Sequence, residues 1–373
     1  MVNLLSNIKR FKSFFYTPLK VDFLIYTDID KETLLRKIIT KKKIFCIYNL
    51  KFGFNLFLFS LSNIFFFFSR YSYIERYILF LTKFYRPKLV ISTFDNYNFI
   101  YKIKHLTGVK SCFIQNGTRA RYFKKQEMDK KNFVDYKFLF GQNSKFFYDK
   151  VCTGKSFIMG SLKNNFIKAK NYPKNKRTIG FVSQFRITEK KLPEEDILFF
   201  LNKFCIKNNY KINIYMFGSP SVQGKAQKLF LKEKLFYKNI LKCKKKLIIR
   251  ESSLSHYVNL NKEEVIVNID STLGYEMLGK KKKIIFFSIR DTDRKYMGFN
   301  NKGGHYFGFP YNYAKKGLCW CNIYDEKIFE SLLLRTLNEN NKNWKKKIAT
   351  ISKNIMIFDY KNSKLKSFLN NYE

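Results

Sequence analysis

The residues best suited to chemistry lie in one short segment, residues 270–279, which follows an apolar run and begins with Asp270. The pattern predicts a strand, a turn, a helix and a second strand. Ser271 or Thr272 is placed to cap the helix, so that backbone N–H groups and hydroxyls would face the space beyond the strand, where a phosphate could bind. Glu276 follows within the first turns and could hydrogen-bond a ribose diol. A capped amphipathic helix without a ligand is the alternative.

The elements that must position this segment alternate between strand-like and helical patterns. Strands are expected at 21–26, 44–48, 89–93, 111–115, 138–140, 157–159, 178–183, 211–217, 247–250, 265–269 and 283–288. Helices are expected at 193–207, 222–241, 252–260, 272–278, 326–338 and 343–354. The polar segment 168–177 divides the two series as a linker. Such alternation predicts an α/β chain with two parallel sheets and crossover helices.

Further polar groups follow strands of the second half. After the strand 178–183, Ser183, Gln184 and Arg186 offer a hydroxyl, an amide and a guanidinium that could contact phosphates, with a solvated loop as the alternative. Gly218 would allow a ligand to approach the backbone, although a plain tight turn fits as well. His305 lies in a glycine-rich loop and could contact a phosphate or a sugar, or lie on the surface.

The first half shows a similar arrangement of polar residues after two of its strands. Asp95 and Asn96 follow the strand 89–93. The strand 111–115 is followed by several polar groups, namely Gln115, Asn116, Gly117, Arg119 and Arg121. A third block, which begins with Cys319, precedes the last helical region.

These blocks, in this order and spacing from about residue 85 to about residue 340, resemble the bacterial surface-carbohydrate (O-antigen and capsule) biosynthesis proteins, a family similar to GT-B glycosyltransferases. The resemblance implies two Rossmann-like domains that face a central cleft. Their expected bounds are 1–167 for the acceptor-side domain, 168–177 for the linker, 178–340 for the nucleotide-sugar donor domain and 341–373 for a C-terminal helical tail.

The resemblance also implies glycosyl transfer from a nucleotide-sugar to a glycan or lipid-linked acceptor. Inverting transfer needs a base, and Asp95 stands at the right strand end, although an N-cap of a following helix is an equal alternative. Donor phosphates would be bound by Ser183, Gln184, Arg186, Gly218, Asp270, Ser271 and Thr272, with Glu276 on the ribose. The acceptor or donor sugar would meet Asn96, Gln115, Asn116, Gly117, Arg119, Arg121 and His305. Transfer of a phosphopolyol from a CDP donor is the second hypothesis.

The chain is strongly basic, with 72 Lys and Arg against 28 Asp and Glu, a net charge of +44. Nucleic acid, an anionic membrane and an anionic substrate are the partners that such a charge admits. An AT-rich genome would also enrich Lys, Asn, Ile, Phe and Tyr. The lysines are scattered and no helix-turn-helix, zinc-finger or RNA-binding signature is present, so a nucleic-acid-binding protein is the hypothesis from another class and no nucleic acid is expected.

The uncharged run 52–69 is long enough to span a bilayer. It contains Asn55, Ser60, Ser62 and Asn63 and leads into another aromatic helical pattern at 71–84, which favours a buried or interfacial helix pair. Without a secretory signal, we expect a cytoplasmic protein that is peripheral to the inner membrane and meets an anionic surface.

No cofactor and no metal are expected. The seven cysteines lie mostly in apolar runs, and Cys319 and Cys321 have no second pair or nearby histidine, so alternate positions on a strand fit better than a zinc site. The donor half offers Asp291 and Asp293 as its single Asp-X-Asp spacing, in a charged loop. We therefore predict transfer that needs no divalent ion.

Overall fold

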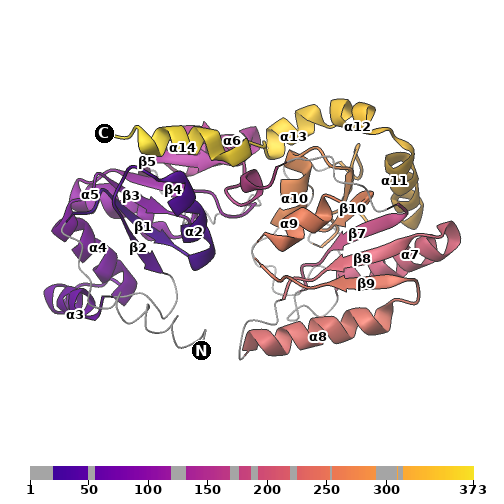
Figure 1. Cartoon of the computed structure of the whole chain (residues 1–373), viewed down its shortest axis with the longest axis horizontal. Coiled ribbons are helices and arrows are strands. Elements are labelled where there is room, and N and C mark those ends of the chain that lie inside the picture. The colour runs from indigo at the N-terminus through magenta and orange to yellow at the C-terminus, as the bar shows by residue number, and fades with distance from the viewer. Residues whose placement is uncertain are drawn as a thin grey trace.

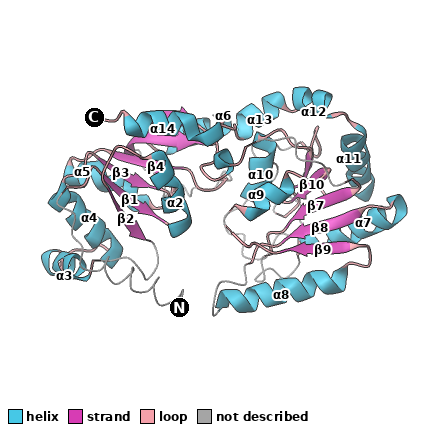
Figure 2. Ribbon diagram, viewed as in Figure 1, coloured by secondary structure: helices cyan, strands magenta, loops and turns pink. Residues whose placement is uncertain are grey.

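The chain folds into two parallel β-sheets flanked by helices (Figure 1; Figure 2). The computed structural model describes residues 20–48, 55–118, 132–168, 176–185, 192–218, 225–252, 254–290, 309 and 314–373. Over these residues each sheet has six strands, in the orders β2-β1-β3-β4-β5-β6 and β12-β11-β10-β7-β8-β9. This confirms the predicted α/β class and its division into two sheets.

The first sheet takes its strands in an order that places β3 and β4 at its centre. Its strands are β1 (Phe23–Thr27), β2 (Ile44–Tyr48), β3 (Leu89–Ser92), β4 (Ser111–Ile114), β5 (Phe133–Leu139) and β6 (Thr153–Ile158). Its helices are α2 (Ile29–Ile38), α3 (Leu56–Phe65), α4 (Tyr73–Tyr85), α5 (Ile103–Thr107) and α6 (Gln142–Val151), with short 3₁₀ turns at Asn98–Lys102 and Asn164–Phe166. The predicted strands 138–140 and 157–159 were too short, because β5 and β6 begin with partly exposed, mixed residues that no apolar run reveals.

The second sheet repeats the plan, and its helices α7 and α8 are the longest among the described residues, at 16 residues each. Its strands are β7 (Thr178–Val182), β8 (Lys211–Tyr215), β9 (Lys245–Ile248), β10 (Val265–Asn268), β11 (Ile284–Phe287) and β12 (Trp320–Cys321). Its helices are α7 (Pro193–Asn208), α8 (Lys225–Ile240), α9 (Ser255–Leu260), α10 (Thr272–Gly279) and α11 (Glu326–Asn338). Strands β7, β10 and β11 are buried along their whole length, which is why they read as continuous apolar runs.

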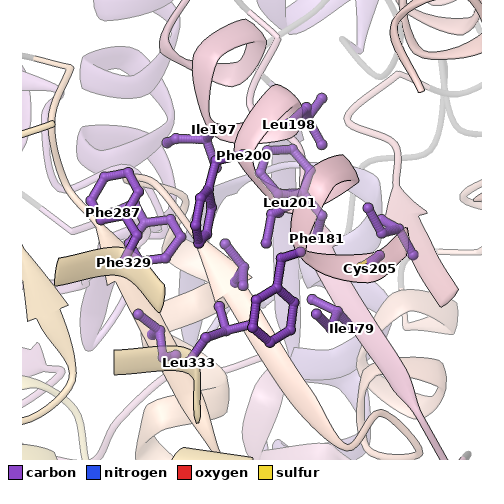
Figure 3. Close-up of a cluster of buried hydrophobic side chains, with 14 of the residues drawn as sticks. Ile179, Phe181, Ile197, Leu198, Phe200, Leu201, Cys205, Phe287, Phe329 and Leu333 are labelled. Atoms are coloured by element: carbon purple, nitrogen blue, oxygen red, sulfur yellow. The ribbon is translucent and has the colours of Figure 1, made fainter. Parts of the chain in front are cut away.

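Aromatic side chains fill the layer between the second sheet and the helices α7 and α11. Figure 3 shows Phe200, Phe287 and Phe329 meeting in this core, and the rings of Phe287 and Phe329 stack with their centroids 3.9 Å apart. Stacked and edge-on aromatic pairs add stability beyond the area that they bury. The core therefore fixes the strand ends that carry the polar groups described below.

The C-terminal helices connect the two halves. After α12 (Asn341–Lys347) and α13 (Ala349–Ile355) the chain crosses to the first sheet, where Leu365 and Leu369 of α14 (Ser363–Asn370) join its core (Figure 1). At the crossing Gly160 has a φ of +78°, and a Cβ there would lie 2.1 Å from the carbonyl oxygen of Ile357. Only glycine permits this approach. The predicted linker lies mostly outside the described residues, and the predicted domain bounds stay a prediction.

Helices α3 and α4 pack against each other at the edge of the first half. The side chain of Asn55 caps α3, and Ser72 and Glu75 form a capping box on α4. The rings of Phe59 and Tyr77 hold the pair together at 5.6 Å. In the part of the chain that the structure describes, no helix is both long and apolar enough to cross a membrane. The run at 52–69 thus contributes α3, which ends at Phe65, to a helix pair.

Candidate functional site

A cleft of about 420 Å³ lies where strand ends of the two sheets meet. Its polar lining from the first half comprises Lys31, Gln115, Asn116, Ser161 and Lys163. Its lining from the second half includes Ser183, Phe217, Arg250, His256, Ser271, Thr272 and Glu276. Six of the residues predicted from sequence are thereby brought together, namely Gln115, Asn116, Ser183, Ser271, Thr272 and Glu276.

The turn before α10 presents two hydroxyls to the cleft. Ser271 occupies the N-cap position, but its side chain makes no capping hydrogen bond, so the predicted side-chain cap is wrong. Asn268 instead holds the turn through a 3.2 Å hydrogen bond from Nδ2 to the Ser271 carbonyl oxygen. A Cβ at Gly274 would lie 2.4 Å from that Nδ2, so the motif needs glycine there. The helix N-terminus therefore lines the cleft without a cap from Ser271 and suits an anion.

Glu276 links α10 to the first half. Its side chain is buried and accepts a hydrogen bond from the Ser161 hydroxyl, while Asn164 Nδ2 donates to its backbone oxygen at 2.7 Å. Nearby, the Thr118 N–H lies 3.2 Å from Thr272 Oγ1. Burial raises the pKa of Glu276, and hydrogen bonds from Ser161 and Tyr257 oppose that rise. A ribose at Glu276 would therefore have to share or replace the Ser161 contact.

Asp270 lies beneath this turn and is not among the cleft-lining residues. Its Oδ2 lies 3.1 Å from Arg290 Nε, and Arg290 also pairs with Glu194. All three side chains are buried. Burial raises the pKa of Glu194 to about 7, and the charge of Arg290 opposes the rise. The three side chains anchor the ends of β10 and β11 to α7.

Three cations line the cleft that the sequence analysis did not single out, Lys31, Lys163 and Arg250. Lys31 Nζ pairs with Asp28 at 2.7 Å, and burial lowers its pKa. Asp30 lies 3.5 Å from both Lys163 Nζ and an Arg250 nitrogen, so it faces cations of both halves. The available signal was the charged run that follows the first predicted strand at its carboxyl end.

Glu233 of α8 organises the strand end of β8. Its carboxylate accepts hydrogen bonds from the Ser183 hydroxyl at 2.6 Å and from the backbone N–H groups of Phe217 and Gly218, each at 2.8 Å. Burial raises the pKa of Glu233. Because Gly218 faces α8, the alternative of a structural turn describes it better than close approach to a ligand. Gln184 is likewise not among the residues that line the cleft.

His256 of α9 brings an imidazole to the cleft wall. Its Nε2 lies 2.9 Å from the Met216 carbonyl oxygen, which can only accept, so Nε2 carries the proton. Burial lowers the pKa of His256 and the nearby charge of Arg250 lowers it further, so the ring is neutral at pH 7. Nδ1 is then an acceptor, and it has no partner within the described part of the chain.

Asp95 is completely buried and is not among the cleft-lining residues. Its Oδ1 accepts the Asn116 N–H at 3.0 Å, and the Tyr148 hydroxyl bonds to its other oxygen. The N-cap alternative is wrong, because the following 3₁₀ helix begins at Asn98, with Tyr97 at the cap position. Asp95 therefore holds in place the loop that carries Asn116 to the cleft, and its role as a base stays a prediction.

The remaining predicted residues divide into three groups. Gln115 lines the cleft but is engaged by the backbone, since its Oε1 accepts the Phe140 N–H and its Nε2 donates to the Gly117 oxygen, each at 2.9 Å. Asn96 is exposed, and neither it nor Gly117 lines the cleft. Arg119, Arg121, Arg186 and His305 lie outside the described residues.

The described residues contain no group of three or more His, Cys, Asp and Glu side chains that could hold a metal ion. Asp291 and Asp293 fall outside them. The seven cysteines are all buried and free. Cys321 ends the short strand β12, and Cys319 lies directly before that strand.

A family described as "putative O-antigen biosynthesis protein" matches residues 112–199 and 192–373 of the sequence. The chain belongs to this family. The match covers the cleft-lining strand ends of the second half together with the C-terminal helices. A search of curated protein sequences found no match.

Solved structures share the fold over almost the whole chain. A UDP-GlcNAc 2-epimerase from Methanocaldococcus jannaschii, in complex with UDP-GlcNAc and UDP, is 12% identical with a TM-score of 0.54 and covers 93% of this chain and 98% of its own. The wall teichoic acid polymerase TagF is 11% identical with a TM-score of 0.56, covering 98% and 91%. The UDP-GlcNAc 2-epimerase from Neisseria meningitidis is 11% identical with a TM-score of 0.53, covering 94% and 99%. This chain therefore has the two-domain GT-B fold.

Proposed function

We propose that this protein is a glycosyltransferase of surface-polysaccharide assembly that transfers a sugar from a nucleotide-sugar to a glycan or lipid-linked acceptor. One observation carries the proposal: the N-terminus of α10, with Ser271, Thr272 and Glu276, lines a cleft between the sheets that also contains Lys31, Lys163 and Arg250. Hydroxyls, N–H groups and cations are the groups that bind a diphosphate and stabilise it as it leaves. The family membership and the relatives that bind UDP-GlcNAc support this choice.

The cleft also offers surfaces for the nucleoside. Phe217 lies at the cleft wall with 64% of its surface exposed, so its ring is free to stack on a base. Glu276 would take the ribose diol, and the Nδ1 acceptor of His256 would receive a hydrogen bond from a donor group of the base. In the first half, Gln115 and Asn116 would meet the sugar or the acceptor.

The first experiment is a thermal-shift screen with CMP, CDP, UDP, GDP and TDP. A nucleotide that binds the folded state raises the melting temperature by mass action. We expect a selective response to one base, and no response to any of the five would overturn the proposal. A basic nucleic-acid-binding protein, the hypothesis from another class, would instead bind DNA or RNA with a steep dependence on salt.

Two variants then test the ribose contact. Glu276→Ala should abolish the nucleotide-dependent shift, since the loss of a charged hydrogen bond costs about 1.5–3 kcal/mol of binding. The same variant also loses the Ser161 contact, so Ser161→Ala is the matched control: it removes that contact, keeps the carboxylate and should keep the nucleotide response. Equal responses in Glu276→Ala and the unmodified protein would show that Glu276 does not bind the ribose.

The runner-up function is transfer of a phosphopolyol from a CDP donor. The likeness to TagF, one structure of which was soaked with CDPG, favours it as the second candidate. The two reactions differ in the fate of phosphorus. A glycosyltransferase leaves a nucleoside phosphate and adds only the sugar, whereas a phosphotransferase adds the phosphate as well, so phosphorus NMR of the acceptor product separates them.

We further propose that transfer needs no divalent ion and that the protein works at the cytoplasmic face of the inner membrane, where it would meet a lipid-linked acceptor. Activity should persist in EDTA. If it disappears and returns with magnesium or manganese, Asp291 and Asp293 become the first suspects. High salt or alkaline carbonate should release the protein from membranes, whereas protein that yields only to detergent would be embedded in the bilayer.

A further inference from the structure

Two separate elements expose apolar side chains among cations, one in each half of the molecule. The first is the helical hairpin, defined here as α3, α4 and the turn between them. Within it Phe65, Phe67 and Phe68 are 71%, 68% and 98% exposed. Exposing such apolar rings to water is unfavourable, and a protein rarely leaves several of them adjacent on its surface without a partner.

The charges around the hairpin indicate the partner's chemistry. Arg70, Lys83, Arg86 and Lys88 are exposed in and directly after the hairpin, and Glu75 is its one acidic residue. Arg76 fixes the turn from within, since its guanidinium donates to the backbone oxygens of Tyr71 and Ser69 at 2.9 and 2.8 Å. The exposed rings at the tip are therefore held on a braced turn beside positive charge.

The second element is α8 of the donor-side half. Its inward face carries Glu233 and Tyr237, both buried, whereas Leu231 and Leu235 are 55% and 60% exposed. Positions 231 and 235 lie one turn apart on the same face of a helix. The exposed cations of α8 are Lys228, Lys232 and Lys238. Because Glu233 is the helix's one acidic residue and points inward, lysines are the only charged residues among the exposed residues of α8 that the structure describes.

We propose that the hairpin and the outer face of α8 together form a two-point docking surface for an anionic phospholipid bilayer. The pairing of apolar tips with cations is what such an interface binds, through apolar burial and attraction to anionic headgroups. In Figure 1 the hairpin and α8 lie on the same side of the molecule, away from α12, α13 and α14, with one in each half. The inference rests on the proposed peripheral location and adds that both halves contact the bilayer, so that the cleft between them is held at the membrane.

The test is co-sedimentation of the full chain with vesicles that contain phosphatidylglycerol. The hairpin variant is Phe67→Ser with Phe68→Ser, and the helix variant is Leu231→Ser with Leu235→Ser. Each should weaken vesicle binding at least about tenfold, as the loss of two buried apolar side chains implies. The matched control is Phe199→Ser with Ile206→Ser on α7, where the two residues are 46% and 60% exposed. The control should bind as the unmodified protein does.

Phosphatidylcholine vesicles supply the second arm, and we expect weak binding to them. Unchanged binding in the helix variant would overturn the two-point contact, and equal binding to both vesicle types would overturn the anionic requirement. If the control variant binds vesicles as weakly as the other variants do, exposed apolar side chains support binding wherever they lie on the surface. That result also contradicts the proposal. Thermal shifts with nucleotide should be the same in all variants, so failure of the docking surface stays distinct from failure of the proposed function.

Discussion

The two sheet edges that meet at the cleft differ in how far their polar groups are hydrogen-bonded within the protein. In the first half, the Asp95 carboxylate and the Gln115 amide are buried and accept hydrogen bonds from the protein backbone. In the second half, the Ser271 side chain makes no capping bond, and His256 Nδ1 has no hydrogen-bond partner among the described residues. A satisfied polar group stabilises the fold, whereas an unsatisfied one beside a cleft is available to a ligand. The difference suggests a first half that supports loops and a second half prepared for binding.

The largest expected effect is on stability, from Asp95→Ala. The variant leaves the buried Tyr148 hydroxyl and the Asn116 N–H without their acceptor, which should lower the free energy of unfolding by about 2–4 kcal/mol. Ser271→Ala, at the other edge, should change it by no more than about 0.5 kcal/mol. Urea denaturation measures both. Similar losses in the two variants would break the comparison.

The proposed catalytic role of Asp95 is tested separately with Asp95→Asn, which keeps the shape and one acceptor oxygen. If Asp95 is the base, transfer should fall by about 10²- to 10⁴-fold while the nucleotide-dependent thermal shift stays. Turnover close to that of the unmodified enzyme would leave Asp95 as a support for the Asn116 loop, and the base would have to be sought elsewhere in the cleft.

A smaller effect is expected at Phe217, which sharpens the comparison on the donor side. Phe217→Ala should weaken nucleotide binding by about 5- to 150-fold, since the loss of a base–aromatic stack is worth about 1–3 kcal/mol. Phe217→Tyr keeps the ring and should bind normally. Titration calorimetry with the nucleotide and with ribose 5-phosphate separates the contributions, because the alanine variant should bind the ligand that lacks a base as well as the unmodified protein does.

Much of the fold could be predicted because its signals are local. Continuous apolar runs revealed β7, β10 and β11, and the segment that begins at Asp270 revealed the turn and helix of the donor side. The glycine in that motif has a steric cause, the side chain of Asn268, that lies only six residues away. The outer parts of β5 and β6 were missed because their residues are mixed and partly exposed, so no period marks them.

The site was harder to predict because its decisive contacts join residues far apart in the sequence. Glu276 was assigned to a ribose from its spacing, but its contact with Ser161 comes from the other half of the chain. Asp95 was weighed as a base or an N-cap, and no local pattern reveals that Tyr148 and Asn116 surround it. Lys163 and Arg250 were missed for the same reason, since scattered basic residues give no signal until the two sheets face each other. Lys31 lies in the charged run after the first predicted strand, which was the one local signal.

The smallest effect concerns Lys280, which follows the last turn of α10. Its amine lies 5.3 Å from the centre of the Phe358 ring, and burial lowers its pKa to about 7, although the charge of Glu276 opposes the fall. In the unfolded chain the lysine keeps a pKa near 10.4. Between these values the unfolded state binds more protons than the folded state, so the unfolding free energy should rise as the pH increases from about 7 towards 10.

Lys280→Met tests this directly, because methionine keeps most of the buried stem and removes the charge. We expect the variant to be more stable than the unmodified protein at pH 7, because its folded state no longer buries a desolvated charge. The gain should shrink as the pH rises towards 10, where the folded amine is neutral, and urea denaturation at several pH values measures it. Lys353→Met, at an exposed site on α13, is the control and should give the same difference at every pH. A constant difference for Lys280→Met as well would mean that the amine is paired in solution, and the donor-side helix would then resemble the satisfied edge of the first sheet.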